Sequence, residues 1–347
     1  MKKILFITGY EESERYINGF TQIYHSLNDS CGGIDFNFRY LFVTRSRKKF
    51  TNTSDKKTAK AFVFLPIAKS EILYAMQKYF IKFKDFNHRN IDTIVFDSDP
   101  YSILIHQTII RIIRPKKIIY RQSDPMFILS SSSLVVKAEK ELMKKSDHIA
   151  VVNRWIYDKV VDLNINNKVV ELPNPMKLSE IGNLERFNIR GFDSHFVYYG
   201  KYYINYKLIN DVAACNPEHA FIIFGAYESD KLYENNIFFK GFQNLDCILG
   251  WLNSSKGLFI PYLDKGHSDM LGVTSKILVA QKLCKPVIAT AVNSQLLSYN
   301  VTVCSDTKSF SDSIRNVDYL GHPKVPIGKY SEESVCALMK SLILDEN

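Results

Sequence analysis

Short apolar segments alternate with amphipathic segments of helical period along this chain of 347 residues, and that alternation restricts the folds open to it. Lys3–Thr8, Thr93–Phe96 and Lys117–Tyr120 have the composition of buried strands. Three segments have the period of the helices that connect such strands, Glu71–Phe86, Tyr101–Ile113 and Leu134–Lys145. Because strands that alternate with helices form parallel sheets, the sequence predicts an α/β protein with doubly wound parallel sheets.

The length suits two domains better than one. A second strand–helix series runs from His195 to Thr290, and Pro173-Asn174-Pro175 gives a stop and hinge signal between the two series. We therefore predict two Rossmann-like domains, over residues 1–175 and 176–329, and a last helical segment over residues 330–347.

The composition excludes several classes of protein. The six cysteines are scattered and form no pair or Cys/His cluster with the spacing of a zinc site, so a zinc site is not expected. No apolar run approaches the ~20 residues that span a bilayer, and the N-terminal run is too short for a secretory signal.

The positive charge is unevenly distributed. Residues 1–150 hold 25 Lys and Arg against 15 Asp and Glu, a net +10, and the remainder holds 20 against 21, a net −1. Two segments, Glu71–Arg89 and Ile105–Lys117, mix basic with apolar residues as helices do on an anionic membrane. An ordinary lysine-rich surface with inward apolar faces is the alternative. Nucleic acid is not expected, because no nucleic-acid-binding signature accompanies the charge.

The most informative segment is Gly257–Thr290. A short strand leads through a polar loop to Thr274-Ser275-Lys276, which begins a helix, and a second strand follows. The start of a helix favours an anion through its free N–H groups and its dipole, and Lys276 adds a full charge.

This segment resembles the donor-binding segment of GT-B glycosyltransferases, in which the diphosphate of a nucleotide sugar lies at that helix start. His148–Asn153, Lys168–Asn174 and the turn Asn216-Pro217-Glu218 resemble other parts of the same fold. The resemblance implies an N-terminal domain that binds the acceptor, a C-terminal domain that binds the donor, a cleft between them, and a C-terminal helix that packs back on the first domain.

The resemblance is closest to the inverting glucuronosyltransferases of bacterial exopolysaccharide synthesis, whose Met-Lys pair Ser275-Lys276 resembles. The paired glutamates of the large retaining group would fall at Leu271 and Val279, so both carboxylates are missing.

An inverting transfer needs one general base, and a carboxylate on a loop after a strand can serve. We expect Asp124 to be that base, with Arg121 positioning it or a substrate anion. Asp97 and Asp99 are candidates for acceptor binding. The alternative for each Asp-Pro pair is a turn or helix N-cap with Pro at the first helical position.

The donor site is expected to include further residues. Lys201 is a second phosphate-binding candidate, and aromatic and acidic residues after the strands would hold the nucleoside or simply pack the domain. The donor-binding set is Thr274, Ser275, Lys276, Lys201, Tyr227, Glu228, Phe242 and Tyr262. The resemblance implies no metal and no cofactor, because helix N-terminus and basic side chains stabilise the leaving diphosphate.

The sequence thus predicts an inverting, metal-independent glycosyltransferase. It would move a sugar from a nucleotide donor, a UDP-sugar and possibly a uronic acid, to a lipid-linked or oligosaccharide acceptor in bacterial surface polysaccharide synthesis. It would work in the cytoplasm, peripherally at the inner face of the plasma membrane. A retaining GT-B enzyme and a non-catalytic subunit of a polysaccharide assembly complex are the alternatives.

Overall fold

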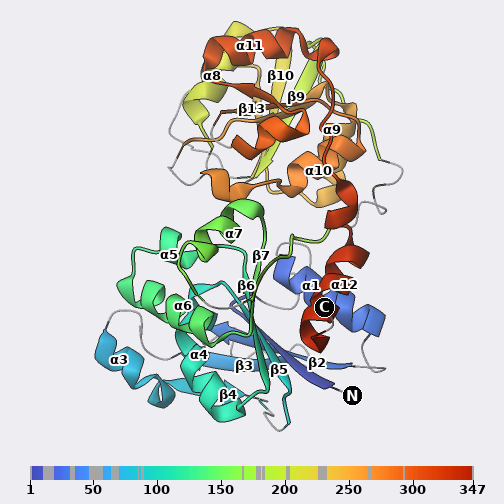
Figure 1. Ribbon diagram of the computed structural model, residues 1–347. Helices are drawn as coiled ribbons and strands as arrows, with labels where there is room; N and C mark the ends of the chain where they lie inside the picture. Colours follow the sequence, from blue (N-terminus) through green and yellow to red (C-terminus); the bar gives the residue numbers. More distant parts are fainter. Residues whose placement is uncertain are drawn as a thin grey trace. The chain divides into compact units, whose positions relative to one another are not determined.

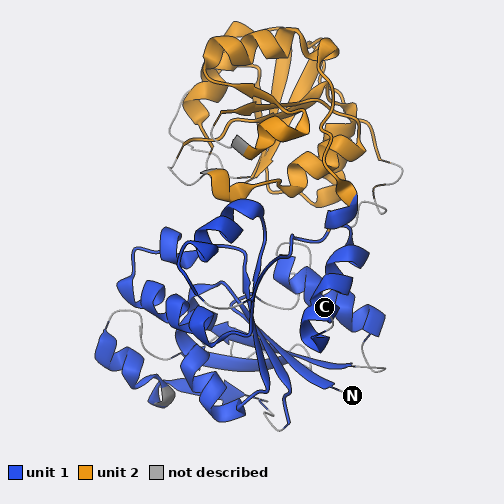
Figure 2. Cartoon of the chain, in the orientation of Figure 1, with its two compact units in different colours: residues 1–175, 328–347 blue, residues 176–327 orange. Residues whose placement is uncertain are grey.

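The computed structural model describes residues 2–10, 19–31, 36–46, 58–63, 70–84, 86, 90–165, 168–176, 181, 184–200, 204–225, 233–264, 268–291 and 294–345. The chain forms two compact units, residues 1–175 with 328–347 and residues 176–327 (Figure 2). Each unit contains a mainly parallel sheet flanked by helices, which confirms the predicted α/β class (Figure 1).

The sheet of the first unit has eight strands in the order β4-β3-β2-β1-β5-β6-β7-β8. All neighbours pair in parallel except β3 and β4, which are antiparallel. The strands are β1 Lys2–Thr8, β2 Phe36–Thr44, β3 Thr58–Val63, β4 Ile81–Lys84, β5 Thr93–Asp97, β6 Lys117–Gln122, β7 His148–Val151 and β8 Lys168–Glu171.

Helices cover both faces of this sheet because its strands are apolar on both sides. Phe6 of β1 packs against Phe20 and Tyr24 of α1, and α12 contacts α1 and β6. Helix α4 makes contacts with α6 and with β1, β2 and β5. The helices are α1 Gly19–Cys31, α3 Glu71–Ala75, α4 Pro100–Ile113, α5 Met126–Leu129, α6 Ser133–Lys145, α7 Arg154–Val161 and α12 Glu332–Leu344, with short 3₁₀ turns η2 Gln77–Tyr79 and η7 Ile327–Tyr330.

The predicted helix over Glu71–Phe86 is wrong. The chain there forms α3, then η2, and then strand β4, whose Ile81 and Phe83 pair with β3. The predicted helix over Tyr101–Ile113 exists as α4, but Ile103, Ile105 and Ile109 are fully buried and belong to the core. None of the described helices combines the length and the apolar character needed to cross a bilayer.

The sheet of the second unit has the order β11-β10-β9-β12-β13-β14, and its strands all pair in parallel. The strands are β9 Ser194–Gly200, β10 His219–Gly225, β11 Ile237–Gly241, β12 Gly257–Ile260, β13 Val287–Thr290 and β14 Thr302–Cys304. The helices are α8 Tyr206–Cys215, α9 Leu245–Ser254, α10 Ser275–Lys282 and α11 Thr307–Arg315, with 3₁₀ turns η4 Ser268–Leu271, η5 Ser294–Tyr299 and η6 Val317–Tyr319.

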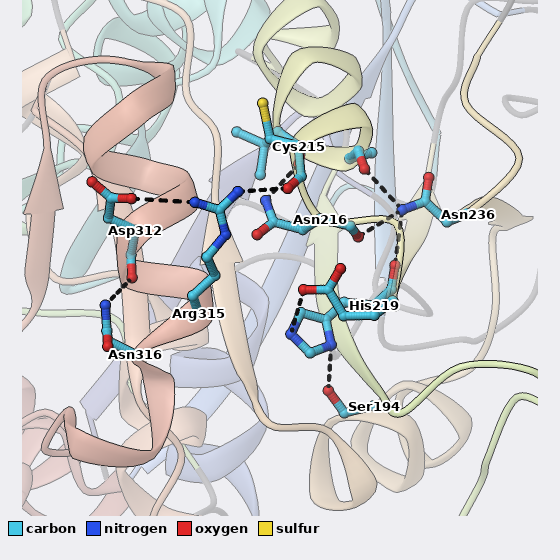
Figure 3. A network of polar contacts seen from close by, with 11 residues as sticks. Ser194, Cys215, Asn216, His219, Asn236, Asp312, Arg315 and Asn316 are labelled. Atoms are coloured by element: carbon cyan, nitrogen blue, oxygen red, sulfur yellow. Dashed lines mark hydrogen bonds and ion pairs between the residues drawn. The ribbon is translucent and has the colours of Figure 1, made fainter.

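A polar network closes the amino-terminal end of β10 (Figure 3). The Asn236 amide donates to the carbonyls of Ala213, Asn216 and His219 at 3.0, 3.0 and 2.9 Å. Arg315 of α11 donates to the Cys215 carbonyl at 2.7 Å, at the end of α8. These side chains add donors to the carbonyls of the last turn of α8 and of the turn that follows it. The network therefore stabilises the turn that leads into the amino-terminal end of β10.

The C-terminal helix α12 packs in the core of the first unit, and one buried lysine of β6 bonds its last turn. Lys117 Nζ donates to the carbonyls of Leu342 at 2.9 Å and Ile343 at 3.2 Å, and it pairs with Asp345. A positive charge at a helix C-terminus is favourable because the free carbonyls carry negative partial charge.

We predict that Lys117→Met destabilises the protein by about 1–3 kcal/mol, because the buried carbonyls of α12 lose their donor. Lys116→Met is the matched control, since Lys116 is 84% exposed in its pair with Asp92 and such pairs contribute at most about 1 kcal/mol. Urea unfolding measures both variants. Equal losses would show that Lys117 does not anchor the helix.

Candidate functional site

Loops at the carboxyl ends of β1, β5 and β6 form the candidate site of the first unit. The strand order reverses between β1 and β5, which is where ligands of open α/β sheets bind. Three of the predicted residues, Asp97, Asp99 and Arg121, lie at these ends, and Asp124 follows two residues after β6.

Arg121 is a fully buried cation at the end of β6. Its Nη2 donates to Asn174 Oδ1 at 2.5 Å, and its Nη1 donates to the Ser123 hydroxyl. Burial lowers the pKa of Arg121 to about 10, while the charges of Asp97 and Asp124 raise it, so the group stays protonated at neutral pH. A buried charge needs compensation from its neighbours, and these two carboxylates supply it.

Asp97 and Asp99 are buried, and their carboxyl groups accept hydrogen bonds from other residues of the protein. Asp97 is 1% exposed and accepts hydrogen bonds from the Thr8 hydroxyl at 2.8 Å and from the Ser98 N–H at 2.9 Å. Asp99 is the N-cap of α4, with Pro100 at the first helical position, and its second oxygen accepts from the Gly9 N–H at 2.8 Å. The N-cap alternative is therefore confirmed for Asp99.

The close approach to Asp99 explains Gly9. A Cβ at that position would lie 2.6 Å from Asp99 Oδ1, so only glycine lets the backbone after β1 reach the carboxylate. Both aspartates shape the carboxyl edge of the sheet, and any contact that they make with an acceptor must go through their neighbours.

Asp124 differs from the other two aspartates because its side chain is exposed. Ser98 Oγ accepts from the N–H groups of Ser123 and Asp124, both at 2.9 Å, which fixes the backbone. Pro125 rather than Asp124 is the N-cap of α5, and it makes no side-chain capping bond. Among the described residues, no donor bonds the Asp124 carboxylate. The protein around it raises its pKa by desolvation, and the Arg121 charge lowers it.

The candidate site of the second unit lies where β9, β12 and α10 meet. The strand order reverses between β9 and β12, and α10 begins at Ser275 after the N-cap Thr274. Gly225 at the end of β10 has φ +115°, and a Cβ there would lie 2.1 Å from the Gly200 carbonyl oxygen. Glycine therefore brings the ends of β9 and β10 together beside the helix start.

Lys276 is held between two aromatic rings at this helix start. Its Nζ lies 5.6 Å from the ring centre of Tyr199, 5.9 Å from that of Tyr262, and 3.5 Å from the Tyr262 hydroxyl. Such cation–π contacts hold the ammonium group in place. None of the described carboxylates forms an ion pair with it.

Two hydroxyls beside Lys276 are buried and lack a hydrogen-bond partner within the described parts of the chain, Thr274 Oγ1 and Tyr199 Oη. Burial raises the pKa of Tyr199, and the neighbouring Tyr262 raises it further, so the phenol is neutral and can donate. A helix start, a lysine and two unsatisfied donors together form a site suited to an anion.

The remaining predicted donor residues have mixed outcomes. Ser275 is exposed at the first position of α10, and Phe242, directly after β11, is 71% exposed. Lys201, Tyr227 and Glu228 lie outside the described residues. A cavity of about 350 Å³ adjoins Tyr262 and is lined mainly by residues at the ends of β12, β13 and β14 and the start of α8.

The structure adds site residues that the sequence analysis missed. Asn174 had been part of a hinge signal, yet it bonds Arg121. Tyr199 directly precedes Gly200 at the end of a strand, a position that could have identified it. Glu139 of α6, which holds the backbone after Asp124, gives no sequence signal of its own. Within the described ranges, no group of three or more His, Cys, Asp or Glu side chains is arranged to hold a metal ion.

No protein-family model matches this sequence, and a search of curated proteins finds no match. Solved structures do match. Sucrose-phosphate synthase from Thermosynechococcus elongatus is 12% identical, with TM-score 0.62 over 99% of this chain and 97% of that one. An α-glucosyltransferase in complex with UDP-glucose and DNA containing an abasic site is 9% identical, with TM-score 0.56 over 97% and 94%.

A TarM variant from S. aureus, in complex with Fondaparinux, α-GlcNAc-glycerol and UDP, is 12% identical, with TM-score 0.55 over 99% of this chain and 100% of that one. At these identities the likeness shows the fold alone. The chain has the GT-B fold, with two Rossmann-like domains, as the sequence analysis predicted.

We predict a pH dependence of stability from Asp97. Burial, and then the charge of Asp99, raise the pKa of Asp97 from 3.8 to about 7. Between those values the folded state holds a proton that the unfolded chain releases, so this group makes stability fall as the pH rises, by at most about 1.4 kcal/mol per unit. Urea unfolding of the wild type and Asp97→Asn from pH 4.5 to 8 should give a steeper decline for the wild type. Parallel curves would contradict the raised pKa.

Proposed function

We propose that this protein is a GT-B glycosyltransferase that uses a nucleotide-sugar donor. The observation that carries the proposal is the anion site at the start of α10. Among the described residues, Lys276 there has no carboxylate partner and two buried hydroxyls have no acceptor. Two of the structures that share the fold are complexes with UDP-glucose or UDP, which favours a UDP-sugar here.

The donor diphosphate would accept hydrogen bonds from the N–H groups at the start of α10 and from Lys276. As the bond from the sugar to the diphosphate breaks, negative charge grows on the phosphate oxygen, and fixed positive charge at that place lowers the barrier. Because protein groups supply this charge, we propose that the transfer needs no metal ion.

Asp124 is our proposed general base. The acceptor hydroxyl oxygen would attack the anomeric carbon, Asp124 would take the hydroxyl proton, and the nucleoside diphosphate would leave from the opposite face, which inverts the anomeric configuration. A raised pKa helps a carboxylate accept a proton, and the exposed position of Asp124 lets an acceptor reach it. Arg121 would keep it oriented and stabilise its negative charge before the proton moves.

Other residues of the second unit would bind the nucleoside, and the Ser275-Lys276 pair bears on the sugar. Exposed Phe242 offers a face for a base to stack on, and the proposed roles of Lys201, Tyr227 and Glu228 rest on sequence position. The likeness of Ser275-Lys276 to the glucuronosyltransferase motif favours a uronic acid donor. Two alternatives stay open, a retaining enzyme whose missing glutamates other groups replace, and a non-catalytic subunit of a polysaccharide assembly complex.

A lipid-linked or oligosaccharide acceptor in bacterial surface polysaccharide synthesis completes the proposal, with docking of the protein on the cytoplasmic face of the membrane.

The outer face of α6 carries four exposed lysines, Lys137, Lys140, Lys144 and Lys145. An ion pair from Lys137 to Glu71 and a hydrogen bond from Tyr74 to Glu141 tie α3 to this helix. Next to it, α3 and η2 expose the apolar side chains Ile72, Met76 and Tyr79. Basic and apolar groups side by side suit an anionic bilayer.

Two substitutions should distinguish the proposed donor site from the proposed general base. Lys276→Ala should weaken UDP binding about 10- to 100-fold by calorimetry, because the phosphates lose a charge-assisted partner. Asp124→Asn should leave UDP binding unchanged and lower the transfer rate about 10²- to 10⁴-fold, because the amide cannot take the proton.

The controls for these variants are Lys282→Ala, in the last turn of α10, and Asp162→Asn, exposed after α7. Nuclear magnetic resonance of the product gives its anomeric configuration, and retention would exclude the inverting mechanism. If the wild type binds no nucleotide and no nucleotide sugar, the non-catalytic alternative holds.

For the membrane, we predict that replacing Lys140, Lys144 and Lys145 with Glu abolishes sedimentation with vesicles that contain phosphatidylserine, because the charge attraction is reversed. The control replaces Lys282, Lys308 and Lys324 of the second unit, with the same change of charge. Equal binding by both triple variants would overturn the docking surface, and preferential binding of duplex DNA would assign the basic face to nucleic acid.

A further inference from the structure

We propose that Glu139 is a positioning residue that sets the loop bearing Asp124 for transfer. The inference rests on the proposed function and deepens it. Glu139 lies on α6 and is completely buried, and no Lys or Arg of the described chain forms an ion pair with it. Four hydrogen-bond donors surround its carboxylate instead.

Two of these donors come from the strand before Asp124. The Tyr120 hydroxyl donates to Glu139 Oε1 at 2.6 Å, and the Gln122 amide donates to the same oxygen at 2.9 Å. Tyr120 and Gln122 flank Arg121 on β6, and alternate residues of a strand point to opposite faces. Glu139 therefore contacts one face of β6, and the Arg121 side chain lies on the other face.

The other two donors come from the chain after Asp124. The Met126 N–H donates to Oε1 at 3.1 Å, and the Phe127 N–H donates to Oε2. These N–H groups belong to the first turn of α5, where no helical carbonyl can receive them. One carboxylate thus connects the strand that leads into the Asp124 loop with the turn that leaves it.

Ser98 Oγ holds the middle of the same loop through the N–H groups of Ser123 and Asp124. The backbone is therefore fixed on both sides of Asp124, whereas its side chain makes no hydrogen bond to a described residue. This is the arrangement that a general base requires, since an error of about 1 Å at a reacting group can cost about 10²-fold in rate.

Burying the Glu139 carboxylate costs free energy, as its pKa and its apolar neighbours indicate. Desolvation raises the pKa of Glu139, and its four hydrogen bonds oppose that rise. Its neighbours on the buried face of α6 are Val135, Ala138, Leu142 and Met143. An apolar residue would pack there at lower cost, but it could not accept from the loop.

Glu139→Gln in the full chain tests the proposal. Gln can offer one oxygen only, so its NH₂ must face either the Phe127 N–H or the three donors to Oε1. We expect faster hydrogen exchange at the N–H groups of Met126 and Phe127, a 10- to 100-fold lower kcat, and unchanged UDP affinity. The acidic limb of the pH–rate profile should also shift, because Asp124 moves relative to Arg121.

Glu141→Gln is the matched control on the same helix. Its carboxylate accepts from Gln107 at 2.5 Å and from Tyr74 at 3.3 Å, and it does not contact the loop. We expect less than a 2-fold change in kcat and no change in exchange at Met126 and Phe127. If Glu139→Gln does not fold, Tyr120→Phe removes one donor to Glu139 and should shift the profile in the same direction by less.

Unchanged exchange at Met126 and Phe127 would overturn the anchor. Faster exchange with the wild-type kcat and pH profile would overturn the positioning role, and so would a lower kcat with the wild-type profile, which a loss of folded protein alone produces. A wild type that transfers no sugar would overturn the proposed function and the positioning role together, and the exchange measurement would still report the anchor.

Discussion

A parallel sheet must bury both of its faces, and this requirement governs both units. The strands are apolar on each side and helices cover them, so polar side chains on a strand persist only where partners satisfy them. The carboxyl ends of the strands are where such partners gather. In the first unit Asp97 is the last residue of β5 and Arg121 lies one residue before the end of β6, and in the second unit Lys276 lies in the first turn of α10. The candidate chemistry collects at these edges because the rest of each sheet excludes it.

The first unit concentrates buried charge at one edge. Asp97, Asp99, Arg121 and Glu139 are all buried, and the three carboxyl groups have raised pKa values because water is removed from them. Each is fixed by hydrogen bonds from backbone or side-chain donors, so none can turn outward without losing them. Asp124 is the exception, with a fixed backbone and an exposed side chain. A rigid polar framework around one accessible carboxylate is the arrangement that keeps a base in place.

Sequence patterns located most strands and the loops that follow them, because buried strands are apolar runs and their ends are marked by glycine, serine and aspartate. They failed over Glu71–Phe86, where aromatic and lysine residues fit a helical period. There Ile81 and Phe83 alternate instead, and pairing with β3 decides the structure. Position after a strand made Asp124 a candidate, and position at a helix start made Lys276 one. It could not select Glu139 or Asn174, whose importance depends on which loop the fold brings against them.

Two lysines lie at opposite ends of two helices, one at a C-terminus and one at an N-terminus. Lys117 lies at the C-terminus of α12, where carbonyls and Asp345 satisfy its charge. Lys276 lies in the first turn of α10, where the helix dipole opposes a positive charge. Two tyrosine rings hold it there without an anionic partner among the described residues. A bound anion would relieve both the dipole and the unpaired charge, whereas a surface lysine would avoid them by turning to solvent. The unfavourable placement therefore favours a phosphate-binding role for Lys276 over no role.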